Sequence, residues 1–133
     1  MNLERPLPEL SGVGAPFWQA ARQHRLVAPK CKQCGKVLFY PRAICPFDWS
    51  SALEWVELSG HGLIYTYTVV RQPAHPAFAE RVPYVLALIE LAEGIRIMSN
   101  VVAPLEAIQI GMPVAVRFED VDEEVSLPFF VPE

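Results

Sequence analysis

The chain has 133 residues and a formal net charge of −4; 52% of its residues are hydrophobic and 20% are charged. A chain this apolar can bury a core, which excludes an intrinsically disordered protein, and its length suits one domain or two small modules that share a core. No apolar run approaches the roughly 20 residues that span a bilayer, because the longest one is interrupted at Glu90. The amino terminus has no cationic start followed by an apolar stretch, so no secretory signal is predicted and we expect a cytoplasmic protein.

The first part of the chain, residues 1–29, is predicted to hold an extended arm and one helix. Residues 1–13 contain two prolines and no sustained hydrophobic period, which is typical of an arm. From residue 14 to residue 26 apolar side chains recur at helical spacing. Phe17 and Trp18 lie on this apolar stripe, where they either cover the rest of the chain or form a docking surface for a partner, and we favour the partner.

Residues 30–52 hold all three cysteines of the chain, arranged in two short motifs. Cys31 and Cys34 are separated by two residues, a spacing that lets both sulfurs reach one metal ion. Cys45 begins a second motif of the same spacing, with Asp48 where a fourth cysteine would stand. Such a pair is typical of a zinc ribbon, and zinc also accepts carboxylate oxygen, so all four side chains are predicted zinc ligands. Because structural zinc sites are mostly built from Cys and His, an empty or partly occupied ribbon is the alternative.

Residues 53–133 are predicted to form a barrel. The hydrophobic pattern changes here from helical spacing to alternation, most clearly where Val114, Val116 and Phe118 oppose small or charged residues. Turns that contain glycine or proline separate five such strands, at residues 54–58, 63–71, 84–91, 95–102 and 113–120. Five short antiparallel strands fit a small closed barrel of the oligonucleotide/oligosaccharide-binding (OB) type, and a tail at residues 126–130 could add to one edge.

Motifs along nearly the whole chain resemble one family in their order and spacing. They are Phe17-Trp18-Gln19-Ala20-Ala21, Cys31-Lys32-Gln33-Cys34-Gly35-Lys36, Tyr40-Pro41-Arg42, Cys45-Pro46, Glu54-Trp55-Val56, Gly60-His61-Gly62, Tyr65-Thr66-Tyr67-Thr68-Val69-Val70, Pro83-Tyr84 and Gly111-Met112-Pro113-Val114. The sequence is similar to the thirty-fifth domain-of-unknown-function family of acyl-CoA-associated proteins. The resemblance implies a mainly β protein with an N-terminal helix, a rubredoxin-like zinc ribbon and a C-terminal five-stranded OB barrel. Asp48 departs from the family pattern, since many members carry cysteine there.

The resemblance implies an accessory subunit more than a self-sufficient enzyme. Family members look like partners of thiolase-like proteins, including sterol-carrier-type thiolases and aldolases, and of MaoC-like hydratases in acyl-CoA and lipid metabolism. The implied ligands are zinc and an acyl-CoA, and the implied role is to help hold the CoA moiety and to bridge catalytic subunits. No catalytic residue is predicted in this chain, and a homo-oligomer is a further possibility.

A CoA site needs cations for the phosphates and a slot for the narrow pantetheine arm. Lys36 and Arg42 in the ribbon are the candidate phosphate ligands, with solvated surface cations as the alternative. Tyr65 and Tyr67 are predicted to share one strand face, where they either line a ligand groove or pack in the barrel. Phe78 lies in a long loop between two strands and either contacts a ligand or partner or forms a small core under the loop.

Two other functions compete with this prediction. Zinc ribbons and OB barrels often bind single-stranded nucleic acid, but 15 acidic residues against 11 basic ones, and an acidic run at residues 118–124, disfavour that partner. An independent enzyme is the second competitor, because His61 and His75 are candidate general bases by residue type. Neither histidine has a recognisable partner at motif spacing, so we expect loop histidines that cap turns.

Overall fold

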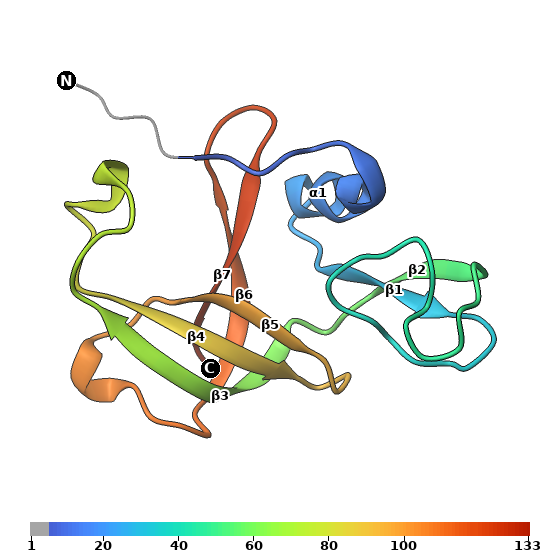
Figure 1. Cartoon of the computed structure of the whole chain (residues 1–133). Helices are drawn as coiled ribbons and strands as arrows, with labels where there is room; N and C mark the ends of the chain where they lie inside the picture. Colours follow the sequence, from blue (N-terminus) through green and yellow to red (C-terminus); the bar gives the residue numbers. More distant parts are fainter. Residues whose placement is uncertain (1–5) are drawn as a thin grey trace.

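The computed structural model describes residues 6–133 and places a short helix and a two-stranded sheet beside a closed β-barrel (Figure 1). The first five residues of the predicted arm lie outside the described residues. In chain order the elements are η1 (Gly12–Gly14), α1 (Ala15–Arg22), β1 (Val27–Cys31), β2 (Leu53–Glu57), β3 (His61–Val70), η2 (Pro76–Phe78), β4 (Tyr84–Leu91), β5 (Arg96–Val101), η3 (Leu105–Ala107), β6 (Pro113–Asp120) and β7 (Ser126–Pro132). The predicted fold class is confirmed.

The helix α1 is shorter than the sequence pattern predicts. It ends at Arg22 rather than near residue 26, because His24 adopts a left-handed backbone conformation with a φ of 59°. The amides of Gln23 and His24 donate to carbonyls in the last turn at 2.9 Å, which closes the helix. Among residues 6–133, no helix is long and apolar enough to cross a membrane.

Phe17 is part of the protein core and not a free docking residue. Only 6% of its surface is exposed, and its ring packs edge-on against Trp18 and Phe39, with centroids 4.8 and 5.8 Å apart. Trp18 is half-buried and packs against the same core. The expectation that Phe17 is held for a partner is therefore wrong, because the ribbon loop and the barrel already cover it.

The strand β2 belongs to the ribbon and not to the barrel. It pairs antiparallel with β1 along its whole length, from Val27 opposite Glu57 to Cys31 opposite Leu53. The prediction that residues 54–58 form a barrel strand is therefore wrong. Alternation identifies a strand but not the strand that it pairs with. The sequence of β1 gives no strand signal, because it contains Pro29 and proline is rare within strands.

The fifth barrel strand is β7, the segment that was predicted only as an addition to an edge. The barrel order is β3-β4-β5-β7-β6, and all neighbours are antiparallel except β5 and β7. The parallel pair meets only where Val101 lies opposite Phe130, and the Ser99 hydroxyl adds a hydrogen bond of 2.9 Å to the Pro128 carbonyl. The β5–β7 junction is therefore the place in the barrel wall where two neighbouring strands have the fewest paired residues, and we call it the β5–β7 seam.

One large hydrophobic core joins the barrel to the helix and to the start of the ribbon. Ile64, Ile89 and Phe130 fill it from the barrel, whereas Phe17 and Ala28 enter it from α1 and β1. A separate small cluster lies in the ribbon and contains Cys31, Leu38 and Cys45. The helix and the barrel thus bury apolar surface together, whereas the ribbon has little apolar surface of its own to bury.

Candidate metal centre and ligand groove

The first cysteine pair lies in a tight turn at the end of β1. The Cys31 amide donates to the Lys36 carbonyl, and the Gly35 amide donates to the Cys31 carbonyl, both at 2.9 Å. Gly35 has a φ of +77°, a conformation that glycine adopts without a steric penalty. The Cys34 amide points at the Cys31 sulfur at 3.4 Å. The turn therefore brings the two thiols to one point.

A second turn, at residues 45–50, repeats the backbone of the first. The Cys45 amide donates to the Ser50 carbonyl at 2.8 Å, and the Trp49 amide donates to the Cys45 carbonyl at 2.9 Å. Trp49 occupies the position that Gly35 has in the first turn and has a φ of 64°, which is uncommon for a residue other than glycine. The two motifs predicted from spacing are thus present as a pair of matching turns.

The structure brings the four predicted metal ligands together. Their ligand atoms all lie within 4.8 Å of one another. The Cys34 and Cys45 sulfurs are 3.7 Å apart, and the Cys31 sulfur is 3.4 Å from Oδ2 of Asp48. A tetrahedral zinc ion with Zn–S near 2.3 Å and Zn–O near 2.1 Å needs separations of about 3.8 Å between sulfurs and about 3.6 Å between sulfur and oxygen. The donors and their spacing therefore fit a four-coordinate zinc ion.

Backbone amides lower the pKa of two of these ligands. The Ser50 amide donates to Oδ1 of Asp48 at 3.0 Å and is the main reason why the pKa of this carboxyl is lowered. The Cys34 amide is the main cause of a lowered pKa of the Cys31 thiol, whereas burial raises the pKa of the Cys45 thiol to about 11. A metal ion in the site would hold Cys45 as a thiolate, since a coordinating thiol is deprotonated.

The two cations predicted to meet CoA phosphates both lie on the exposed surface of the ribbon. The Lys36 ammonium is 4.4 Å from the centre of the Phe47 ring, a cation–π contact. Arg42 is exposed, and within residues 6–133 neither cation takes part in an ion pair. Both side chains are therefore available to an anionic ligand.

A β-bulge separates the two tyrosines that were expected to share a strand face. The pairing of β3 with β4 shifts between Ile64 and Thr66, so Tyr65 is the extra residue. Tyr65 is 46% exposed, and the Arg96 guanidinium lies 3.7 Å from its ring centre. Tyr67 is half-buried and packs against the core. The prediction of one shared face is wrong, because strict alternation does not allow for a bulge.

Two adjoining cavities lie along the β5–β7 seam. The first, of about 460 Å³, is bounded by Phe78, Arg81 and the arm residue Pro6, and the second, of about 450 Å³, is bounded by Trp18 of α1 and by Tyr40 of the ribbon loop. The residues that line both cavities are Leu86, Asn100, Leu127 and Phe129. We call the two cavities together the seam groove. Of the five residues predicted to contact CoA, Phe78 is the one that lines it.

The two histidines that were candidate general bases both have partners in the structure, but only His75 lies in a loop. His75 accepts a hydrogen bond of 3.0 Å from the Ala77 amide through Nδ1 and caps η2, which confirms the expectation that it caps a turn. His61 is the first residue of β3, so the expectation that it is a loop residue capping a turn is wrong; its exposed ring pairs with Glu133 through Nδ1 at 2.7 Å. The contact of His61 joins residues far apart in the sequence, so no local motif reveals it.

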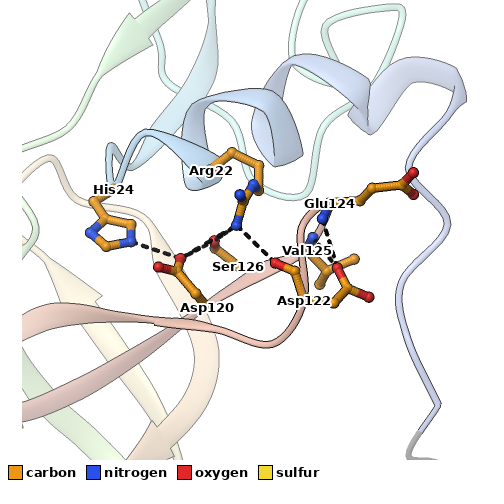
Figure 2. A network of polar contacts seen from close by, with 7 residues as sticks. All are labelled: Arg22, His24, Asp120, Asp122, Glu124, Val125 and Ser126. Atoms are coloured by element: carbon orange, nitrogen blue, oxygen red, sulfur yellow. Dashed lines mark hydrogen bonds and ion pairs between the residues drawn. The ribbon is translucent and has the colours of Figure 1, made fainter.

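A polar network that sequence reasoning missed ties α1 to the loop between β6 and β7 (Figure 2). Arg22 donates to the Ser126 hydroxyl at 3.0 Å and to the Asp122 carbonyl at 3.1 Å, and it lies 3.5 Å from Oδ1 of Asp120. His24 contacts the same Asp120 oxygen at 2.9 Å. The Ser126 hydroxyl donates to Asp120 and is the main cause of a lowered pKa of this carboxyl, followed by His24. These residues are about a hundred positions apart, so no local motif marks them.

Family models match both parts of the chain. The model of the ChsH2 rubredoxin-like zinc ribbon domain matches residues 18–54, and the model of the ChsH2 C-terminal OB-fold domain matches residues 55–119. Both descriptions agree with the arrangement of ribbon and barrel in the structure.

Proteins from several organisms are similar to this chain. A probable enoyl-CoA hydratase alpha subunit of Thermomonospora curvata is 42% identical over 96% of this chain, which spans only 40% of that relative's length. A DUF35 domain-containing scaffold protein of Methanocaldococcus jannaschii is 42% identical over 74% of this chain and 71% of its own length. A homologous scaffold protein of Methanothermobacter thermautotrophicus is 39% identical over 77% of this chain and 78% of its own length.

Solved structures share the fold. A chain of the Ltp2-ChsH2(DUF35) aldolase superposes with a TM-score of 0.85 and 39% identity, covering 95% of this chain and 98% of its own length. A DUF35-family protein from Sulfolobus solfataricus, at 15% identity and a TM-score of 0.64, supports the fold alone. The chain therefore belongs to the DUF35 family, with a ChsH2-type zinc ribbon followed by a ChsH2-type OB-fold domain.

Proposed function

We propose that this chain is a non-catalytic accessory subunit of an acyl-CoA-metabolising complex in the cytoplasm. Its partner would be a thiolase-like protein or a MaoC-like hydratase, which the chain supports or bridges to another subunit. The observation that carries the proposal is the likeness over 95% of this chain to a chain of the Ltp2-ChsH2(DUF35) aldolase. The hydratase alpha subunit and the scaffold proteins among the relatives support the same role.

We propose further that the seam groove helps to hold an acyl-CoA. Its shared wall is mostly apolar, and the amide of Asn100 is already bonded to the Val85 carbonyl at 2.9 Å, so the wall suits a narrow chain with few polar groups. Tyr40 and Pro41 line the groove, and the exposed Arg42 follows them directly in the chain, which supports Arg42 as a phosphate ligand. Phe78 would contact the pantetheine arm or acyl chain of the ligand in the other cavity. Lys36 is the second candidate phosphate ligand.

We propose that zinc is the metal held by Cys31, Cys34, Cys45 and Asp48. Four protein donors leave no open coordination position, which is the arrangement of a structural site and not of a catalytic one. Elemental analysis of the purified protein tests this proposal. About one zinc per chain supports the four-ligand site, whereas a content near zero would identify a ribbon that has lost its metal.

The accessory role is tested by reconstitution. The chain is co-expressed with a thiolase-like or hydratase-like subunit from the same organism. The purified chain, partner and complex are then each titrated with a medium-chain acyl-CoA in a calorimeter. We expect a stoichiometric complex and binding heat that falls in an Arg42→Glu variant but not in Arg117→Glu, a matched change of an exposed barrel cation. Absence of heat from chain and complex contradicts the acyl-CoA contact. Turnover of acyl-CoA by the chain alone at ordinary enzyme rates contradicts the accessory role.

A further inference from the structure

The second turn of the ribbon exposes three large apolar side chains within six residues. Ile44 is 49% exposed, Phe47 is 56% exposed and Trp49 is 83% exposed. We call these three side chains the Trp49 patch. Among the described residues no aromatic ring stacks on Trp49. The folded chain therefore gains almost nothing from burying this indole, although tryptophan is normally among the more buried residues.

The backbone makes the presence of Trp49 harder to explain by folding. The matching turn has Gly35 at this position, and both residues have a positive φ. Residues with a side chain disfavour a positive φ, so glycine at this position would strain the turn less than tryptophan does. The indole of Trp49 therefore neither packs in this chain nor favours the backbone conformation of the turn. Such a residue is typical of a surface that binds another molecule.

The charged residues of the ribbon indicate the charge of the surface that would bind the Trp49 patch. The ribbon segment, residues 30–52, contains four cations that make no ion pair within the described part of the chain: Lys30, Lys32, Lys36 and Arg42. Asp48 is the one acidic residue among residues 30–52 and is part of the candidate metal centre, whereas β2, which completes the ribbon, adds Glu54 opposite Lys30 and Glu57, which pairs with Arg25. By contrast, the cations that pair with acidic side chains elsewhere in the described chain are Arg22, Arg25, Arg81 and Arg96. The ribbon turns thus combine exposed apolar side chains with cations, and the Lys36 ammonium lies directly against Phe47 of the Trp49 patch.

We propose that the Trp49 patch is the surface through which the ribbon docks on the catalytic subunit, and that Trp49 enters an apolar pocket rimmed by carboxylates on that subunit. This proposal rests on the accessory role proposed above and names the contact that serves it. Tryptophan beside cations is the composition of an interface hot spot, and unpaired cations are complemented by an acidic rim. A second copy of this chain, whose β6–β7 loop is also acidic, is the competing occupant that the light-scattering measurement below distinguishes.

Replacement of Trp49 by glycine separates binding from folding. In the purified chain, Trp49→Gly restores the residue type of the matching turn, so we expect an unchanged or higher unfolding temperature and an unchanged zinc content. Its affinity for the co-purified thiolase-like or hydratase-like subunit, measured by calorimetry, is expected to fall about 30-fold or more, as for a hot-spot tryptophan. The matched control is Trp55→Ala, an exposed tryptophan of β2, which is expected to keep the wild-type affinity.

A second pair of variants tests the charge. Lys32→Glu is expected to weaken the complex and to reduce the dependence of its affinity on salt, whereas Arg117→Glu on the barrel leaves both unchanged. If Trp49→Gly should unfold, Phe47→Ser replaces it in the same assay. Wild-type affinity in the folded patch variants overturns the docking surface and leaves the accessory role standing. Failure of the wild-type chain to bind any such subunit removes the accessory role and this proposal with it.

The remaining outcomes assign the Trp49 patch to another partner. A wild-type homodimer in light scattering that becomes monomeric in Trp49→Gly, with subunit binding unchanged, would assign the patch to a second copy of this chain. A gel shift of single-stranded DNA that depends on Trp49, again with subunit binding unchanged, would assign it to nucleic acid. Weaker acyl-CoA binding without weaker subunit binding would assign it to the ligand. Each of these three results overturns the proposal.

Discussion

The ribbon and the barrel are held together by different means. The barrel buries continuous apolar surface, and side chains such as Ile89, Val114 and Phe130 are fully inaccessible in its core. The ribbon has a cluster of only three buried side chains, and Cys31 and Cys45 are two of them. Much of the ribbon is loop, whose backbone follows two turns around the candidate metal centre. The comparison indicates that the barrel is stabilised by burial, whereas the ribbon depends on what its cysteines bind.

Removal of the metal site is expected to give the largest effect and to break the ribbon alone. In Cys45→Ser the ribbon loses a thiolate, and structural zinc binds zinc-finger peptides with about 10–16 kcal/mol, more than three buried side chains can replace. We expect zinc loss and fast amide hydrogen exchange in residues 31–50, with β4 still protected. Chelation of zinc from the wild-type chain should reproduce this pattern. Unchanged exchange in the ribbon after metal loss would show that its small apolar cluster suffices.

A core truncation is expected to break the barrel instead. Phe130 is fully buried on β7 and lies at the seam opposite Val101. Phe130→Ala leaves a cavity there and should lower the free energy of unfolding by about 3–5 kcal/mol in urea denaturation. Zinc content before unfolding should stay at the wild-type value. The matched control is Leu63→Ala on the exposed side of β3, where equal destabilisation would contradict the assignment of the core.

A smaller effect is expected where two barrel strands approach closely. An added Cβ at Gly62 would lie 2.6 Å from the Glu90 carbonyl oxygen and 2.9 Å from Cγ2 of Ile89. Gly62→Ala should therefore force β3 and β4 apart and cost about 1–3 kcal/mol in urea denaturation. Gly14→Ala is the control, because the nearest atom to its added Cβ is 3.9 Å away. Equal stability of the two variants would show that the strands can yield at Gly62.

Local patterns predicted the strands but not how they assemble. The predicted strands at 84–91 and 113–120 coincide with β4 and β6, because strict alternation and flanking turns depend on neighbouring residues only. The prediction put residues 54–58 in the barrel and residues 126–130 at an edge, whereas β2 pairs with β1 and β7 is the fifth barrel strand. Strand pairing depends on contacts between segments far apart in the sequence. The bulge at Tyr65 was missed for a related reason, because the partner strand is what reveals the extra residue.

The metal centre was more predictable than the groove. The two-residue spacing in each motif fixes two ligands in one turn, so Cys31 and Cys34, and then Cys45 and Asp48, could be paired from the sequence. The walls of the seam groove come from the arm, α1, the ribbon loop and four strands, and no spacing rule joins them. Phe78 was found because a long loop that carries an aromatic residue is itself a local signal.

Removal of the Asp120 carboxylate from the network between α1 and the barrel is expected to have the smallest effect on stability, and this effect depends on pH. The pKa of Asp120 is lowered in the folded chain, first by the Ser126 hydroxyl and then by His24. Its contribution to stability is therefore complete above the unfolded pKa of about 3.9 and is lost as the pH falls through the lower folded value. Asp120→Asn should lower the unfolding temperature slightly at neutral pH.

Acidification tests the sign of this contribution. The difference in unfolding temperature between wild type and Asp120→Asn should shrink as the pH falls below about 4, because Asp120 of the unfolded chain is protonated first and Asp120 of the folded chain only at lower pH. Acid also protonates the four candidate metal ligands, but wild type and variant share that change, so it cancels in the difference. Glu123→Gln in the same loop is the matched control and should show no such trend, because the network does not include Glu123. A difference that grows on acidification would mean that the contacts of Asp120 favour its protonated form, so that its carboxylate charge does not help to hold α1 on the barrel.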